Sequence, residues 1–233
     1  MSIPAVSLGL ITLMPRVIVY NSVSVDGAIK DFEINVELHY KVAGKIGADA
    51  MLVGSNTAKS GIEMFTDAFP SEEPADFFKP AIDEVDDRPF WIIPDSRGVL
   101  NGLLHVLRRS GYSKDVILLV SSKTPSGYLE YLKARNFDFI IAGDNYVDYT
   151  VALEEINRRY GVKTLVTDSG GILAGILIER GLVDEIQLLV SPQIVGKTAS
   201  NLFRNINQNV KLQLLNSRSV NNSHVLLIYK VIR

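Results

Sequence analysis

The residues best suited to chemistry in this 233-residue sequence stand in short turns that follow apolar, β-rich runs. The turn Asp168-Ser169-Gly170-Gly171 follows the run VKTLVT and precedes an apolar segment with helical spacing. A helix N-terminus exposes unpaired N–H groups and a positive dipole end, and glycine lets a ligand approach the backbone. This turn is therefore a candidate phosphate cradle. A plain tight turn between a strand and a helix explains the local pattern equally well.

Two carboxylates, Asp26 and Asp168, each end a predicted strand. Either could act as a general acid or orient an N–H group of a substrate. The structural alternatives are that Asp26 shapes an Asp-Gly turn and that Asp168 caps the following helix. The proton donor of any reaction here therefore stays open between Asp26, Asp168 and solvent.

Other kinds of chemistry are disfavoured by what the sequence lacks. Because it has no cysteine, it has no disulfide, no thiol nucleophile and no thiolate metal site. His39, His105 and His224 are far apart and show no metal-type spacing, so no metal is expected. His39 and His105 are interpreted as packing or surface residues. No turn pairs a nucleophile with a histidine, which argues against acyl transfer by a triad.

The composition limits which partners and which cell compartment we expect for the protein. A formal net charge of −2 provides no basic surplus for a nucleic-acid backbone, and 47% hydrophobic residues are ample for a core. No apolar run reaches the roughly 18 residues needed to span a bilayer, and the first residues lack a secretory pattern. We expect a cytoplasmic protein that binds neither nucleic acid nor membrane. Residues 1–15 are predicted to be an N-terminal arm and residues 16–233 a single domain.

Strand and helix patterns alternate along the chain. Helices are predicted at residues 36–46, 124–136, 148–161 and 171–180. Strands are predicted at residues 16–27, 48–55, 88–98, 116–120, 137–143, 162–167 and 184–196. The tail has two β-rich runs separated by NSRSVNNS, which is typical of an antiparallel hairpin.

The stretch from Thr57 to Arg88 is polar and irregular and carries three prolines and the acidic cluster DEVDD. We predict a long excursion or lid loop here, with a short helix around residues 75–82, since loops of this length are usually functional.

This alternation predicts an α/β fold with helices on both faces of the sheet, and the final hairpin makes the sheet mixed. Ligands of such sheets bind beyond the carboxyl ends of the strands. The turns at residues 26–27, 54–57, 94–98, 121–122, 143–144 and 168–171 should therefore converge at one edge.

Four of the segments resemble, in order and spacing, the pyrimidine reductase domain of riboflavin biosynthesis: VSVDGAI, GADAMLVGSNT, PDSRG and LVTDSGGILAGILIERGLVDEIQLLVSPQIVG. The resemblance extends from Arg16 to Phe203. It implies a dihydrofolate-reductase-like three-layer fold with a mostly parallel mixed sheet. It also implies a homodimer that uses NADPH to reduce a ribosylamino-pyrimidine 5′-phosphate, a small molecule whose ribosyl group becomes ribityl.

The resemblance also implies roles for individual residues. Cofactor contacts fall on Thr57, Ser96, Ser169, Gly170, Gly171 and Ile172, the last four forming the phosphate-cradling loop. Asp168 occupies the position of a substrate-contacting glutamate, and Lys45 that of a substrate-binding arginine. Hydride transfer needs no nucleophile, which agrees with the absence of one among the turns.

The sequence departs from the family pattern at several positions. Gly61 stands where the family has an aspartate, and residues 29–32 read IKDF where a Ser-x-Trp segment is expected. Lys45 in place of arginine loses bidentate phosphate geometry. Two alternatives therefore stay open: an NADPH reductase of another small heterocycle or carbonyl compound, and a non-catalytic, nucleotide-binding dimeric scaffold. The choice between NADPH and NADH is open too.

Overall fold

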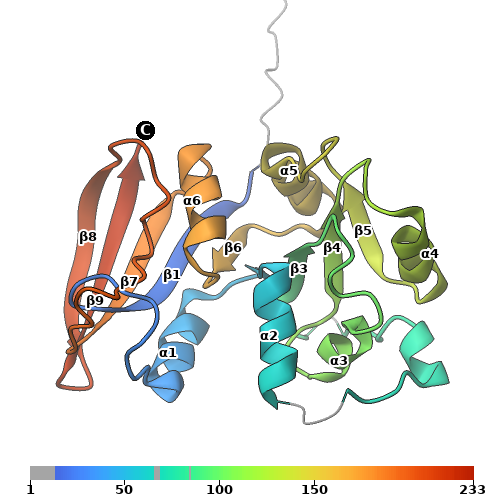
Figure 1. Ribbon diagram of the computed structural model, residues 1–233, viewed down its shortest axis with the longest axis horizontal. Helices are drawn as coiled ribbons and strands as arrows, with labels where there is room; N and C mark the ends of the chain where they lie inside the picture. The colour runs from blue at the N-terminus through green and yellow to red at the C-terminus, as the bar shows by residue number, and fades with distance from the viewer. Residues whose placement is uncertain (1–13, 66–68, 84) are drawn as a thin grey trace, which may run out of the picture.

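The computed structural model describes residues 14–65, 69–83 and 85–233 (Figure 1). In this part of the chain one sheet has the strand order β5-β4-β3-β2-β6-β1-β7-β9-β8. The strands are β1 (Arg16–Ser24), β2 (Ala50–Leu52), β3 (Phe90–Pro94), β4 (Val116–Val120), β5 (Asp138–Ile141), β6 (Thr164–Thr167), β7 (Glu185–Ser191), β8 (Lys211–Val220) and β9 (His224–Ile232). Only the β7–β9 and β8–β9 pairings are antiparallel among these strands, which confirms the predicted mixed, mostly parallel sheet.

Helices cover both faces of this sheet, as predicted. One face carries α1 (Val36–Ala43), α2 (Ser55–Phe65), α3 (Leu104–Arg109) and α4 (Ser126–Ala134), and the other carries α5 (Tyr149–Tyr160) and α6 (Gly171–Glu179). The β4 strand shows the division: Leu118 packs with α3 and α4, whereas Leu119 packs with α5. A strand buried on both faces reads as continuously apolar, and VILLV is such a run.

Local signals set the ends of α5 where the sequence predicts them. The side chain of Asp148 accepts hydrogen bonds from the backbone N–H groups of Thr150 (3.0 Å) and Val151 (3.4 Å). Gly161 then ends the helix in the left-handed region at φ 64°. The predicted helix and both of its caps are confirmed.

The irregular excursion predicted from Thr57 is wrong over its first part. Residues 55–65 form α2, whose Ala58 and Ile62 are buried in the same apolar cluster as Ile93 of β3. With Gly61 inside the helix and mostly polar residues around it, the sequence shows this buried stripe weakly. The short helix α3 is likewise absent from the predicted helices.

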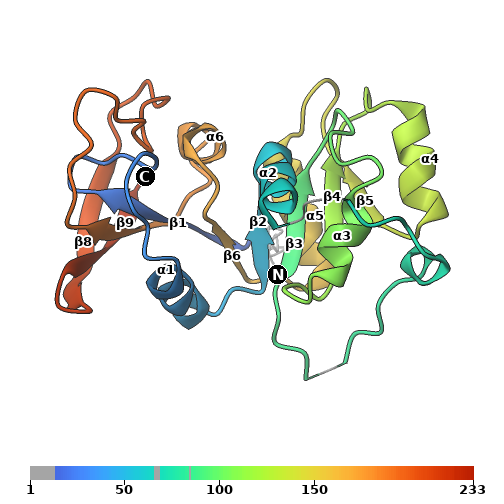
Figure 2. The same ribbon diagram turned by 60° about the horizontal axis from the view of Figure 1, so that its bottom comes forward.

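The later part of the excursion lies against α3 and the end of α4 (Figure 2). His105 Nε2 lies 2.7 Å from the carbonyl oxygen of Pro70, and the amide of Asn136 donates to that of Phe77 (2.7 Å). A 3₁₀ turn at Pro74–Phe77 replaces the short helix predicted at 75–82. A segment held in this way belongs to the fixed fold.

The C-terminal hairpin is confirmed, with a shorter turn than predicted. Residues 216–220 continue β8, and Asn221 and Asn222 make the turn with φ of 52° and 59°. β8 is an edge strand whose Leu214 and Leu215 are each about half exposed.

Most of the predicted arm, residues 1–13, lies outside the described residues; Met14 packs partly buried against the core. None of the helices in the described part of the chain has the length and apolar character needed to cross a bilayer.

Candidate functional site

A cleft of about 350 Å³ opens at the carboxyl edge of the sheet, between the N-termini of α2 and α6. The turns after β2, β3 and β6 line it, together with residues 200–205. Among the predicted site residues it brings together Thr57, Ser169, Gly170, Gly171 and Ile172. The predicted convergence of these turns follows from the parallel strands, whose carboxyl ends share one edge.

The side chain of Ser169 ties two of these turns together. Its Oγ accepts a hydrogen bond of 2.9 Å from the backbone N–H of Gly54, and the residue is 2% exposed. The hydroxyl thereby links the loop after β6 to the start of α2 and fixes the width of the cleft between the two helix N-termini.

The two glycines of the cradle have different surroundings. A Cβ built on Gly170 would lie 3.5 Å from Ile29 Cδ1, an ordinary contact. A Cβ built on Gly171 would lie 2.5 Å from the carbonyl oxygen of Leu202, which no real side chain tolerates. Gly171 is therefore required for backbone packing, and Gly170 leaves space at the cleft. The packing interpretation of the turn therefore holds for Gly171, and the phosphate-cradle interpretation stays a prediction for Gly170.

Three cations also line the cleft: Lys30, Arg97 and Arg204. None of them forms an ion pair with another described residue, and all three are exposed. Two helix N-termini and three free cations around one cleft suit a ligand with several phosphate groups. Ser96 is half-buried, and its neighbours Pro94 and Arg97, not Ser96 itself, line the cleft.

Asp168 lies beside the cleft but does not line it. Its Oδ2 is 3.8 Å from Nε2 of His39 on α1, and its side chain is 22% exposed. The N-cap of α6 is Gly170, and among the described residues nothing donates a hydrogen bond to the Asp168 carboxylate. The helix-capping alternative is therefore not realised, and the carboxylate is free to meet a ligand.

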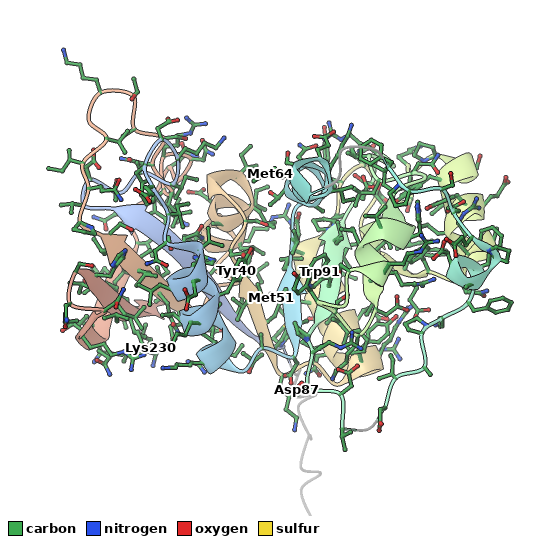
Figure 3. All side chains as sticks on the ribbon, turned by 90° about the horizontal axis from the view of Figure 1, so that it is seen from below. Tyr40, Met51, Met64, Asp87, Trp91 and Lys230 are labelled. Carbon is green, nitrogen blue, oxygen red and sulfur yellow. The ribbon has the colours of Figure 1, made fainter. Side chains whose placement is uncertain are left out.

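The sequence does not indicate that His39 is a neighbour of Asp168. Its Nδ1 lies 2.9 Å from Ser22 Oγ, and its ring contacts Tyr20 (centroids 4.7 Å apart) and Tyr40 (5.1 Å). Burial and the charge of Asp168 raise the pKa of both tyrosines. Figure 3 shows Tyr40 on the side of α1 that faces the middle of the molecule. No spacing in the sequence could indicate that this part of α1 meets the end of β6.

Asp26 is engaged elsewhere. Its carboxylate accepts hydrogen bonds from Ser24 Oγ (2.5 Å) and from the backbone N–H groups of Gly196 (2.8 Å) and Val195 (3.2 Å). These bonds lower the pKa of Asp26 to about 2, so the side chain has no proton to donate at neutral pH. The placement supports the turn-shaping alternative, and a catalytic role for Asp26 stays an untested prediction.

Lys45 lines a different cavity, of about 490 Å³, between α1 and the tip of the β8–β9 hairpin. Lys41 and Arg218 line the same cavity. Leu38 and Val42, the buried residues of α1, also line this cavity. His39 lies on another side of α1 and faces Asp168. The structure thus separates Lys45 from Asp168, which were predicted to share a substrate.

The described residues contain no cluster of three or more candidate metal ligands.

Residues 15–226 match a family model that is described as the RibD C-terminal domain. A protein of Aquifex aeolicus named 2,5-diamino-6-ribosylamino-4(3H)-pyrimidinone 5′-phosphate reductase is 28% identical over 193 residues, covering 78% of this chain and 79% of that protein. A protein of Archaeoglobus fulgidus with the same name is 26% identical over 191 residues, covering 79% and 83%.

Solved structures show the same fold. A pyrimidine reductase-like protein from Corynebacterium diphtheriae superimposes with a TM-score of 0.69 at 17% identity, covering 97% of this chain and 96% of that one. The riboflavin biosynthesis reductase of Saccharomyces cerevisiae gives a TM-score of 0.67 at 15% identity, covering 94% and 91%.

Proposed function

The chain belongs to the RibD C-terminal domain family, and on that premise we propose that residues 16–233 form a single, cytoplasmic NADPH-dependent reductase domain of riboflavin biosynthesis. Its substrate would be the small molecule that its relatives are named for, a ribosylamino-pyrimidinone 5′-phosphate. The observation that carries the proposal is the cleft between α2 and α6, with its two helix N-termini and three unpaired cations.

The cofactor would supply a hydride when bound. The backbone at Gly170 leaves a space that a phosphate of the cofactor could occupy and that a side chain at this position would fill. Arg97, after β3, is the candidate partner of the 2′-phosphate that distinguishes NADPH from NADH, because guanidinium groups bind phosphate bidentately. Thr57 in the first turn of α2 and Ser96 beside Arg97 are proposed cofactor contacts.

The substrate would meet Asp168, whose carboxylate lies beside the cleft and faces His39 at 3.8 Å. Lys45 lies on the other side of α1, so its proposed role is limited to a charged end of the substrate such as the 5′-phosphate. Lys41 and Arg218 beside it would share that role.

A ligand panel tests the cofactor proposal. We expect NADPH at 100 times its Kd to stabilise the fold by about 2.7 kcal/mol, seen as a raised melting temperature. Arg97→Gln should remove most of the preference for NADPH over NADH, whereas Arg218→Gln, in the other cavity, should leave it unchanged. A preference that survives Arg97→Gln would refute the assignment of that residue.

The same panel separates the alternative functions. Stabilisation by NADPH without reduction of the pyrimidine substrate would favour a reductase of another small heterocycle or carbonyl compound. If millimolar NADPH and NADP⁺ leave the melting temperature unchanged, the non-catalytic scaffold becomes the better explanation.

We also propose a homodimer, formed through the edge strand β8. Its exposed Leu212, Leu214 and Leu215 provide an apolar surface on a strand with a free edge. Sedimentation velocity should give twice the mass of one chain, and Leu214→Glu should give the monomer. Tyr146→Glu, another exposed position after β5, serves as the control. A wild-type monomer, or a dimer unaffected by Leu214→Glu, would contradict this interface.

A further inference from the structure

The pair His39 and Asp168 joins two elements that are distant in the sequence, α1 and the end of β6. The carboxylate and Nε2 of the imidazole face each other at 3.8 Å, and neither has a hydrogen-bond partner among the described residues. The buried hydroxyl of Ser169, by contrast, is hydrogen-bonded to the backbone of Gly54. Two groups that can each carry a proton are thus left facing one another beside the cleft.

We propose that His39 and Asp168 together hold the proton that the reduction consumes, with His39 as a positioning residue that keeps this proton on the pair at neutral pH. The inference rests on the proposed function and deepens it, since the sequence left the proton donor open.

The two side chains differ in how readily they carry a proton. An isolated aspartate, with a pKa near 3.9, is almost never protonated at neutral pH. An imidazole, with a pKa near 6.5, is partly protonated there. The 3.8 Å separation of Nε2 and Oδ2 therefore places a proton-carrying group directly beside the carboxylate.

The surroundings of His39 fix the direction of its ring. Ser22, which is 5% exposed, holds Nδ1 at 2.9 Å, and the rings of Tyr20 and Tyr40 contact the imidazole. The Tyr20 hydroxyl also donates to the backbone carbonyl of His39 (2.8 Å), which fixes the helix turn itself. Nε2 is therefore directed to Asp168.

The other titratable groups that face the pair do not compete for the proton. They are Tyr20 from β1 and Tyr40 from α1, and Tyr112 from the loop after α3 acts on Tyr40. Burial and the charge of Asp168 raise the pKa of Tyr20 and Tyr40, so both stay neutral at any ordinary pH. The exchangeable proton near the cleft is thus shared by the imidazole and the carboxylate.

The proposed reaction needs one such proton. Conversion of ribosyl to ribityl breaks the bond between C1′ and the ring oxygen O4′. C1′ gains the hydride, with its two electrons, from the reduced nicotinamide, and O4′ gains a proton. The pair supplies that proton and regains one from solvent.

Ser22, His39 and Asp168 do not form a nucleophilic triad. Ser22 is buried, and its Oγ contacts Nδ1 of His39 while the carboxylate faces Nε2. An attacking hydroxyl must be accessible to a substrate, so acyl transfer is not the function of this arrangement.

The first test is His39→Asn, with His224→Asn as the matched control. His224 is buried and, like His39, has a serine hydroxyl 2.9 Å from Nδ1, but no carboxylate faces it among the described residues. We expect His39→Asn to lower kcat roughly 100-fold and to abolish the alkaline fall of the wild-type kcat–pH profile. The KM for NADPH should change by less than about 3-fold, because the cofactor cleft is untouched. An unchanged kcat and pH profile would overturn the proposal.

The second test does not depend on activity. In NMR titrations, Asp168→Asn should move the titration of the His39 imidazole to lower pH and leave that of His224 in place, because only His39 loses a facing charge. If Asp168→Asn leaves the titration of the His39 imidazole unchanged, the pair does not share a proton and the inference is wrong. If His39 responds but the wild-type protein reduces no pyrimidine, the proposed function fails while the proton-sharing pair stands.

Discussion

Gly170→Val should weaken NADPH binding by roughly 10- to 100-fold, about 1.4 to 2.7 kcal/mol, with little loss of folding stability. Gly170 has φ −59°, which any residue adopts, and a Cβ there meets nothing closer than Ile29 Cδ1 at 3.5 Å. The valine methyl groups would instead occupy the space at the N-terminus of α6 that a phosphate needs. Titration calorimetry with NADPH measures the affinity, and thermal unfolding without ligand measures the stability.

The neighbouring glycine is the matched control. Gly171→Ala should lower the melting temperature, because its Cβ would lie 2.5 Å from the carbonyl oxygen of Leu202 and force the backbone apart. If Gly170→Val destabilises the apo protein as much as Gly171→Ala does, then Gly170 also serves packing, and the cradle loses its main support.

Arg108→Ala should destabilise the protein by about 3 to 5 kcal/mol, the range for removing one partner of a buried ion pair. The side chain is 6% exposed, and its Nε donates to Asp115 Oδ1 at 2.9 Å. Its Nη1 donates to the carbonyl oxygens of Asp76 and Arg135, and its guanidinium lies 3.7 Å from the centre of the Phe137 ring. One side chain thus holds the segment after α2, α3 and α4 together.

Urea unfolding measures this loss. The control is Arg158→Ala, whose exposed pair with Glu155 on α5 is screened by solvent and should contribute little to stability. Affinity for NADPH should survive Arg108→Ala at temperatures where the variant is folded, because Arg108 does not line the cleft. If Arg108→Ala lowers the free energy of unfolding no more than Arg158→Ala does, the contacts of Arg108 contribute little to stability.

The parts of the fold that the sequence predicts are those with strong local signals. Val116–Val120 is apolar at every position, and α5 has Asp148 and Gly161 at its ends, so each can be found without knowing its neighbours. In α2 a buried stripe of Ala58 and Ile62 is interrupted by polar residues and Gly61, and burial is decided only by the contact with β3. That contact is long-range, and no local pattern contains it.

The same distinction applies to the site. The cleft could be predicted because turns after parallel strands share an edge, and Thr57 and residues 169–172 do meet there. The pairing of His39 with Asp168 depends on which side of α1 faces β6, and the engagement of Asp26 depends on the loop at residues 195–196. These are properties of the packed molecule and leave no trace in spacing.

The position of β1 in the sheet bears on how the chain is made. β1 is synthesised well before its two neighbours in the sheet, β6 and β7, which lie at residues 164–191. Until then both edges of an apolar strand are unpaired, a state that invites association with other chains and calls for chaperones. The turns that line the cleft come from residues 29 to 205. A nascent chain therefore completes the lining of this cleft only once residue 205 has been made, so a ligand of the cleft could stabilise the folded domain but could not guide the folding of its first strands.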